Sequence, residues 1–452
     1  MMRRFPLSPL LRRRALWHTH PRFTRHLSAA LCLAAMSCLS AGGTLAAETL
    51  KIGIVGFFTG GAAGTFGIPA RNGSEIVIDA LNAGTVPAPY ASKGIAGARI
   101  EPVYVDESGG TAQVVTEFRN LVQRQDVHAV MGFVSSGSCL GVAPVAEELK
   151  TLTIFSICGT PRIFEEGEYR YVFRTKTHAT ADSVAAARYV ARRMPDIKRV
   201  GGINQNYSWG KDSWGDFTLA LRHLLPAVQL TTEQFPKLFA GQYSSEISAL
   251  LVSRSDLVHS SFWGADFESF ILQAGARGLA QRTTLLFTAA ENSMFRLGEK
   301  LPNGVIMGAE GPYGLFAPDT ALNRWFREEH QQRYGVPAVY PAYVMAQSVL
   351  ALKAAYEKAA AARGGSFPTT EQAIDALKHL TFASPGGEVR MALGKGHQAV
   401  TGHAYGIYQW DAAAKQGTFV DVEHFAAACV NPPEGVKSQD WLQQGMPGAQ
   451  CE

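Results

Sequence analysis

Short apolar runs alternate with amphipathic stretches along most of the chain after residue 48. Four early runs are continuously apolar, which is typical of parallel strands that are covered on both faces. They are LKIGIV (50–55), ARIEPVYV (98–105), HAVMGFV (128–134) and LTIFSI (152–157). Helical periodicity lies between them, in GSEIVIDALNAG, AQVVTEFRNLVQ and GVAPVAEELK. The pattern predicts a doubly wound α/β unit.

The same alternation returns further along the chain. Strands are predicted for YVFRT, VGGIN, VQLTTEQF, DLVHSSFW and TLLFT, with helices at 180–193, 211–224, 244–252 and 266–276. Helices at 320–334, 341–362 and 370–380 follow, and then the strands GGEVRMAL and AYGIYQW. We therefore expect a second α/β lobe, with a ligand cleft where the carboxyl ends of the strands of both lobes meet. Residues 411–452 contain Pro and Gly and are predicted to be irregular.

Charge is concentrated at the start of this 452-residue chain, whose formal net charge is +4. Residues 1–47 carry seven arginines and no Asp, Glu or Lys, and the arginines precede the apolar segment LSAALCLAAMSCL (27–39). Basic, apolar and then small residues predict a secretory signal peptide over 1–47 and a periplasmic location. A lipoprotein anchor at Cys38 is not expected, because the residues before it fit that pattern poorly. Removing the seven arginines leaves 35 basic against 38 acidic residues, which argues against nucleic-acid binding.

Four cysteines follow the predicted signal peptide, and their number favours disulfides in an exported chain. They are Cys139, Cys158, Cys429 and Cys451. Cys429 and Cys451 lie in the predicted tail and either pair with each other or remain free or separately paired. No CxxC and no Cys/His zinc spacing occurs, so we expect no metal and no cofactor.

The turn GFVSSGSC (132–139) joins a predicted strand to a predicted helix, a position where α/β proteins present N–H groups and hydroxyls to an anion. Its spacing does not match the G-x-S-x-G of a nucleophile elbow. GFFTGGAAGTFG (56–67) matches neither the dinucleotide nor the P-loop pattern. Both observations favour binding over catalysis.

Aromatic and acidic side chains also follow predicted strands. Phe66, Trp209 and Trp263 stand at such junctions, and Glu291 lies just past another strand. The competing interpretation of a single aromatic residue is packing in the core. The competing interpretation of Glu291 is a solvated carboxylate in a loop. Several aromatics at equivalent junctions nevertheless favour a ligand site.

The order and spacing of these segments resemble the type I periplasmic solute-binding proteins of the leucine/isoleucine/valine-binding family, over roughly residues 48–410. The resemblance is carried by IGIVGFFTG, GSEIVIDALNAG, VMGFVSSGSCLGVAPVAEE, IFSICGTP, FRTKTHA, NQNYSWGKD and AGARGL. It implies two Rossmann-like lobes joined by three crossovers. The implied N-lobe comprises 48–176 plus 313–380, the C-lobe 177–312 plus 381–410, and the tail 411–452. The crossovers would lie near RTKTH, GAEGP and TFASPGG.

The resemblance also implies roles for single residues. Ser136 falls on the family's carboxylate-binding serine and Thr160, in SICGT, on its threonine, so that both would hold a ligand carboxylate from the N-lobe. The backbone carbonyl of Cys158 falls on an ammonium ligand. Cys139 and Cys158 would lie at the ends of neighbouring parallel strands, close enough for a disulfide.

The aromatic walls and the acid are implied in the same way. Phe66, Trp209 and Trp263 fall on aromatic positions around the ligand, and Glu291 on the acidic partner of the α-ammonium. Tryptophan in place of tyrosine enlarges the apolar walls and shifts the expected ligand away from a small branched side chain.

These expectations describe a monomeric extracytoplasmic binding protein and not an enzyme. By hinge closure it would deliver an amino acid with an apolar or aromatic side chain to the permease of an ABC transporter. Three alternatives remain open: an aromatic carboxylate or an amide or urea-like ligand, a sensory ligand-binding subunit, and an exported enzyme whose nucleophile is Ser136.

Overall fold

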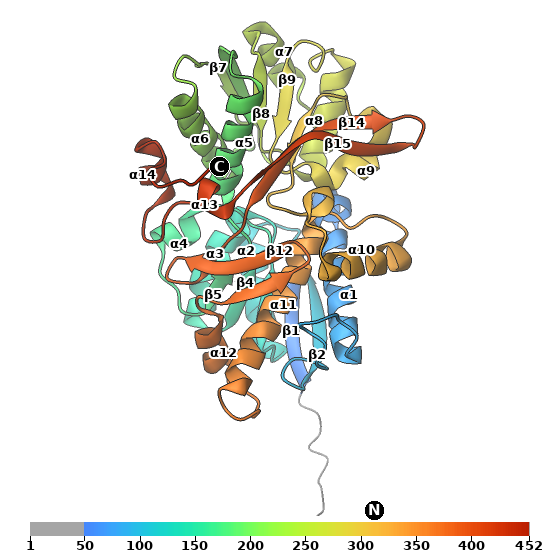
Figure 1. The fold of residues 1–452 in the computed structure, drawn as a ribbon, viewed down its shortest axis with the longest axis vertical. Coiled ribbons are helices and arrows are strands. Elements are labelled where there is room, and N and C mark those ends of the chain that lie inside the picture. The colour runs from blue at the N-terminus through green and yellow to red at the C-terminus, as the bar shows by residue number, and fades with distance from the viewer. Residues whose placement is uncertain (1–48, 452) are drawn as a thin grey trace, which may run out of the picture. The chain divides into compact units, whose positions relative to one another are not determined.

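The computed structural model describes residues 49–451, and the predicted signal peptide lies outside them. Within these residues, fifteen strands form two sheets flanked by helices (Figure 1). We call each sheet with its helices a lobe. The predicted fold class of two doubly wound α/β lobes is confirmed, because the strands predicted from continuous apolar runs pair in parallel inside both sheets.

The first sheet belongs to the N-lobe. Its strands are β1 (Thr49–Gly56), β2 (Arg99–Asp106), β3 (Ala129–Gly132), β4 (Leu152–Phe155), β5 (Val172–Arg174), β11 (Thr381–Ser384), β12 (Gly387–Leu393) and β13 (Gln398–Val400). They are ordered β11-β12-β13-β5-β4-β3-β1-β2. The helices are α1 (Ile68–Ala83), α2 (Thr111–Arg124), α3 (Ser136–Glu148), α4 (Arg162–Glu166), α10 (Ala321–Tyr334), α11 (Tyr340–Ala361) and α12 (Thr370–Leu377), with the short turns η1 (Gly60–Ala62), η2 (Ala63–Gly67) and η5 (Gly314–Phe316).

The second sheet belongs to the C-lobe. Its strands are β6 (Arg199–Ile203), β7 (Gln229–Gln234), β8 (Leu257–Ser260), β9 (Thr284–Phe287), β10 (Ile306–Gly308), β14 (His403–Asp411) and β15 (Gln416–Phe425). They are ordered β15-β14-β10-β9-β8-β6-β7. The helices are α5 (Ala179–Arg193), α6 (Ser208–Leu224), α7 (Ser244–Ser253), α8 (Gly264–Ala276) and α9 (Met294–Leu297), with η3 (Glu291–Ser293) and η4 (Gly298–Lys300).

The third crossover lies later in the chain than predicted. The sequence placed it near TFASPGG (381–387), with residues 381–410 in the C-lobe. Instead β11, β12 and β13 extend the first sheet, where β13 pairs with β5, and the chain passes to the second sheet between Val400 and His403. Apolar periodicity identifies a strand but not its partner, since pairing depends on backbone hydrogen bonds to a distant segment.

The predicted irregular tail is also partly wrong, because residues 416–425 form β15. This strand pairs with β14 along its length and so completes the C-lobe sheet. Residues 426–451 follow this last strand and contain the short helices α13 (Ala427–Val430) and α14 (Ser438–Gln443). We call residues 426–451 the tail strap. A disulfide between Cys429 and Cys451 closes the strap, which is one of the two alternatives that the sequence left open for these cysteines.

The tail strap contacts both lobes. The hydroxyl of Ser438 donates to the Glu165 carboxylate of α4 in the N-lobe at 2.5 Å. The Gln439 amide donates to Asp216 of α6 in the C-lobe at 2.6 Å. Figure 1 shows the strap and α14 beside these two helices. The strap therefore bridges the lobes on the side of the crossovers.

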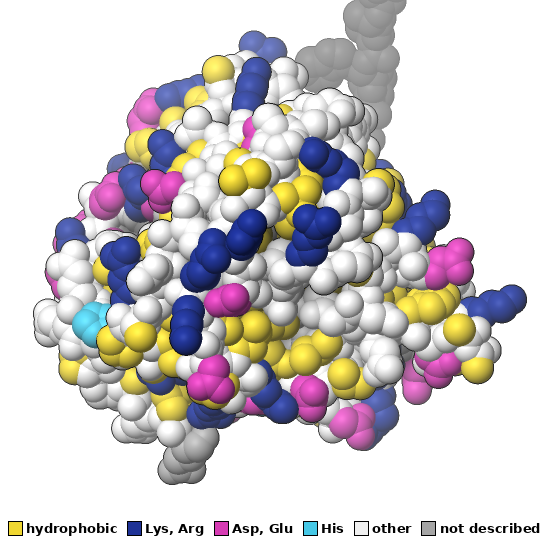
Figure 2. Space-filling model, turned by 90° about the horizontal axis from the view of Figure 1, so that it is seen from above, with side chains coloured by type: hydrophobic (Ala, Val, Ile, Leu, Met, Phe, Trp, Pro, Cys, Tyr) yellow, Lys and Arg dark blue, Asp and Glu magenta, His cyan; other side chains and the backbone are white. Residues whose placement is uncertain are grey.

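Helix α11 forms much of the N-lobe core. Its Ala-rich sequence lets it lie close to α1, where a Cβ added to Gly73 would come within 2.2 Å of the carbonyl oxygen of Ala342. Only glycine permits this approach of the two helices. Although α11 is long, no helix of residues 49–451 has both the length and the apolarity to cross a membrane. On the face drawn in Figure 2, hydrophobic side chains are scattered between charged ones, which is usual for a surface in contact with water.

Candidate functional site

An aromatic cluster joins the two lobes. Phe66 of η2 lies edge-on to Trp263, which directly precedes α8, with ring centroids 5.2 Å apart. Trp263 also lies 5.9 Å from Phe57 of the N-lobe, and Phe66 lies 5.9 Å from Tyr340 at the start of α11. All four side chains are buried. The structure thus brings two of the predicted aromatic residues together from opposite lobes.

Trp209 reaches the N-lobe from the start of α6. Its indole N–H donates to the carbonyl oxygen of Ser261 at 2.9 Å, which fixes the ring orientation. A Cβ on Gly159 would approach Cζ3 of Trp209 to 2.3 Å, so the ring lies against the turn that carries Cys158 and Thr160. The ring therefore covers the predicted carboxylate-binding turn.

Ser136 is the first residue of α3 and is buried. Its Oγ accepts hydrogen bonds from the backbone N–H groups of Gly159 and Thr160, both at 3.2 Å. The serine–histidine pair of a hydrolase is not found here, because no histidine of residues 49–451 makes a hydrogen bond to this hydroxyl. Its own proton remains available to an acceptor such as a ligand carboxylate.

The hydroxyl of Thr160 has a partner in the other lobe. It donates to the Asp212 carboxylate of α6 at 2.6 Å, and the Arg162 guanidinium pairs with the same carboxylate at 2.7 Å. Sequence reasoning missed Asp212, whose position inside a helix gave no signal. Thr160 therefore contributes a contact between the lobes, although it was predicted to bind a ligand carboxylate.

Glu107 occupies the turn that was predicted to hold a ligand anion. Its two carboxylate oxygens accept from the backbone N–H groups of Val134 and Ser135 at 2.7 and 2.9 Å. Burial raises the pKa of Glu107 to about 7, against the lowering effect of these hydrogen bonds. The N–H groups of this turn are therefore occupied by a side chain of the protein itself. The available signal was that Glu107 comes just after a predicted strand.

Cys158 forms the disulfide with Cys139 that the resemblance implied. Its carbonyl oxygen, expected to meet a ligand ammonium, accepts from Nη1 of Arg174 at 3.1 Å. The Arg174 guanidinium comes from the end of β5, the neighbouring strand. The turn that carries Cys158 is thus hydrogen-bonded to a cation of the protein itself.

Glu291 lies on η3 and is fully buried, so it is not a solvated loop carboxylate. Its Oε2 accepts from the backbone N–H of Tyr340 at 3.0 Å, at the N-terminus of α11. Its Oε1 lies against the Gly314–Leu315 backbone: a Cβ added to Gly314 would come within 1.8 Å of it, and a hydrogen bond from the Leu315 N–H lowers the pKa of the carboxyl. Burial raises the pKa of Glu291 to about 7.

A buried ion pair links two crossovers beside these residues. Lys176, in the predicted crossover RTKTH, contacts Glu310, in the predicted crossover GAEGP. The Lys176 ammonium lies 5.9 Å from the ring centroid of Trp209 and 5.6 Å from that of Tyr340. Charged residues in both crossovers were the signal, but sequence reasoning did not use it. No group of three or more His, Cys, Asp or Glu in the described chain could hold a metal ion.

Residues 49–417 match the family model described as periplasmic binding protein, and the chain belongs to this family. The predicted family resemblance is therefore confirmed. No curated protein matches the chain by sequence.

Solved structures with the same fold include solute-binding proteins of ABC transporters. One from R. palustris, in complex with benzoate, has a TM-score of 0.72 and 18% identity over 86% of this chain and 100% of that chain. Another, from Rhodopseudomonas palustris BisB5 with 3,4-dihydroxy benzoic acid, has a TM-score of 0.70 and 19% identity over 84% and 98%. A leucine-binding protein from Thermotoga maritima MSB8 has a TM-score of 0.68 and 19% identity over 82% and 98%.

Proposed function

We propose that this chain is an exported, monomeric substrate-binding protein that delivers a small ligand to the permease of an ABC transporter. The ligand is an amino acid with an apolar or aromatic side chain. The observation that supports the proposal is the buried contact between Phe66 of one lobe and Trp263 of the other, in a chain of the periplasmic binding protein family. The name of the leucine-binding protein of the same fold supports this ligand class.

Each end of an amino acid has a candidate partner here. The Ser136 hydroxyl supplies a donor for the carboxylate, and the buried carboxylate of Glu291 supplies the opposite charge for the ammonium. Phe66, Trp209 and Trp263 provide apolar walls for the side chain. Closing of the lobes about the crossovers would enclose the ligand and form the surface that the permease recognises.

An aromatic carboxylate is the second candidate ligand. Because the pKa of Glu291 is raised to about 7, part of this carboxyl is protonated and neutral near pH 7. A neutral carboxyl needs no ligand ammonium beside it, which favours a ligand without one. The benzoate complex of the same fold supports this candidate. No contact in the site favours an amide or urea-like ligand over these two. A sensory subunit would use the same site.

Proton release distinguishes the two ligand classes. Protein that has been unfolded and refolded to remove bound ligand is titrated calorimetrically near pH 7 with amino acids and with aromatic acids, in two buffers of different ionisation enthalpy. An ammonium beside Glu291 lowers the pKa of that carboxyl, so amino-acid binding releases protons into the buffer. An aromatic acid binds without that release.

The Glu291→Gln variant is the control for this experiment. It removes the titrating group, and we expect it to abolish the proton release and to weaken amino-acid binding. Unchanged amino-acid affinity would exclude the ammonium role of Glu291. If neither ligand class binds the unmodified protein, the proposed ligand is wrong while the family assignment stands.

A further inference from the structure

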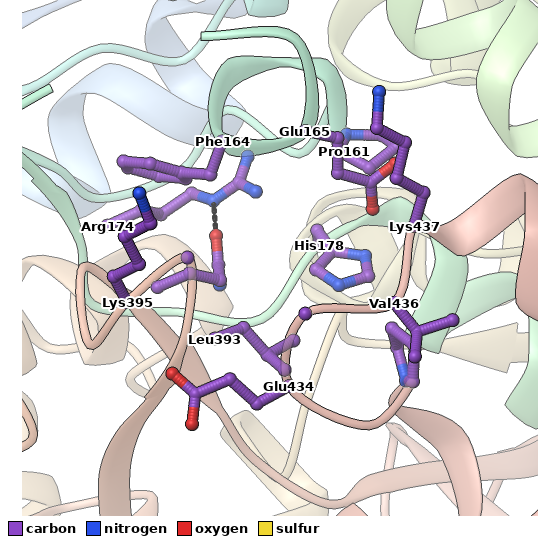
Figure 3. Close-up of a pocket in the computed structure, with 14 residues that line it drawn as sticks. Pro161, Phe164, Glu165, Arg174, His178, Leu393, Lys395, Glu434, Val436 and Lys437 are labelled. Carbon is purple, nitrogen blue, oxygen red and sulfur yellow. Dashed lines mark hydrogen bonds between the residues drawn. The ribbon is translucent and has the colours of Figure 1, made fainter. Parts of the chain in front are cut away.

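A cavity lies at the first crossover and beneath the tail strap, and none of the aromatic residues of the interlobe site lines it (Figure 3). Its volume is about 200 Å³. One wall comes from α4, with Phe164 and Glu165, and another from the first crossover, with Arg174 and His178. Residues 432–437 of the strap close it. The family match ends at residue 417, so this cavity depends on a part of the chain beyond that match.

Arg174 brings a buried positive charge to the cavity. Its side chain is 0% exposed. Nε donates to the Gln398 side chain at 2.5 Å and Nη1 to the Thr160 carbonyl at 2.7 Å, but Nη2 has no partner within residues 49–451. In Figure 3 the guanidinium end turns toward the space between Phe164, Glu165 and His178. Burial lowers the pKa of Arg174 to about 9, which leaves it a cation at neutral pH. A buried cation with a free N–H group needs an acceptor.

His178 is the second buried side chain at the cavity that has nitrogen atoms without a hydrogen-bond partner. It is 2% exposed, and neither ring nitrogen has a hydrogen bond to any described residue. Burial and nearby cations lower the pKa of His178, so the ring is neutral and carries one donor N–H. Two buried side chains from one crossover therefore offer unused donors to the same space.

The charges around the cavity indicate the charge of its ligand. Arg174, Lys395 and Lys437 line it together with only two acidic residues, Glu165 and Glu434. Glu165 is already engaged, because it accepts from both the N–H and the hydroxyl of Ser438. Lys395 is engaged too, because its ammonium pairs with Glu168 at 2.8 Å. The unused donor of the buried Arg174 guanidinium is therefore what favours an anion, and two donors from one crossover suit the two oxygens of a carboxylate.

We propose that this cavity is a second binding site, for a small carboxylate anion. The carboxylate oxygens accept from Nη2 of Arg174 and from the ring N–H of His178, and Lys437 of the strap adds a positive charge to the lining. Arg174 also holds the carbonyls of Cys158 and Thr160, so an anion bound there contacts the group that supports the interlobe turn. The proposal does not depend on which ligand binds between the lobes.

Calorimetric titration with sodium acetate, at an ionic strength held constant with sodium chloride, tests this site. Lys437→Glu reverses the charge of an exposed lining residue, and we expect it to weaken acetate binding by about fivefold or more. Arg174→Gln removes the buried cation and is expected to abolish binding. Lys300→Glu makes the same charge change at an exposed lysine of η4 and should bind acetate as the unmodified protein does. Ser136→Ala should also bind normally, because it alters only the interlobe site.

Several results would overturn the proposal. Equal acetate affinity in Lys437→Glu and the unmodified protein would do so, as would loss of binding in Ser136→Ala alone, which would place acetate between the lobes. Inorganic phosphate binding more tightly than acetate would contradict the carboxylate class. If circular dichroism shows that Arg174→Gln does not fold, Lys437→Glu decides the outcome. Absence of any acetate binding by the unmodified protein would also exclude the site.

Discussion

The Thr160 hydroxyl of the N-lobe donates a hydrogen bond of 2.6 Å to the Asp212 carboxylate of the C-lobe. Arg162, two residues after Thr160, pairs with the same carboxylate at 2.7 Å. Asp212 is buried, whereas the Arg162 side chain is partly exposed. One carboxylate of α6 thus holds both the turn after β4 and the start of α4, and it stabilises the lobes in contact with each other.

Replacing Asp212 by alanine should favour the separated lobes. The variant loses the bonds from Thr160 and Arg162, and we expect ligand affinity to fall by about 1 kcal/mol, since one partner of the ion pair is partly solvated. Calorimetry gives the affinity, and small-angle scattering of the ligand-free protein should show a larger radius of gyration. Glu148→Ala is the matched control, because it breaks the exposed Arg119–Glu148 pair inside the N-lobe. Equal affinities in the two variants would contradict the role of Asp212.

Glu291 should make the protein less stable as the pH rises through neutrality. Its pKa is about 7 in the folded chain against an ordinary value of 4.5, so the folded state binds the proton more tightly. This contribution to the free energy of unfolding is complete below pH 4.5 and is lost as the pH rises through 7. Urea unfolding of Glu291→Gln between pH 5 and pH 8 should therefore show a smaller decrease than the unmodified protein. A decrease of the same size in both proteins would refute this prediction.

The Cys139–Cys158 disulfide should matter for both stability and binding. The two cysteines are 19 residues apart, and removing the bridge in a double alanine variant should lower the free energy of unfolding by about 3 kcal/mol through the entropy of the unfolded chain. Cys158 precedes the Gly159–Thr160 turn, so ligand affinity should also fall. The Cys429–Cys451 double variant opens a loop of similar length, with a separation of 22, and is the control for chain entropy. Equal loss of ligand affinity in both variants would argue against a specific role for Cys158.

Glu107 should be required for the stability of the turn before α3. Alanine at this position removes the acceptor of the Val134 and Ser135 N–H groups, and leaving buried donors without a partner should cost about 1–3 kcal/mol. Glu107→Gln keeps one acceptor oxygen and should lose less. Urea unfolding measures both variants. A stability of Glu107→Ala equal to that of the unmodified protein would show that water replaces the carboxylate at no cost.

Much of the fold could be predicted because strand and helix signals are local. The runs at 50–55 and 128–134 are buried strands, and α11 covers the stretch that helical periodicity assigned to 341–362. The strand partners of residues 381–400 and 416–425 could not be predicted in this way. Their partners, such as β5 for β13, lie far away in the sequence, and the local pattern is the same for either sheet.

The sequence by itself determined the class of the fold and the positions of Ser136, Trp209 and Trp263 at strand-to-helix junctions, because apolar periodicity and turn residues act over a few positions. Only the tertiary structure decided which groups are already paired. It joins Glu107 to the turn before α3 and Glu291 to the N–H of Tyr340, and it leaves Arg174 and His178 with free donors beneath the tail strap. Hydrogen bonds and desolvation depend on distances between remote segments, so the chemical availability of a side chain is decided only when the chain has folded.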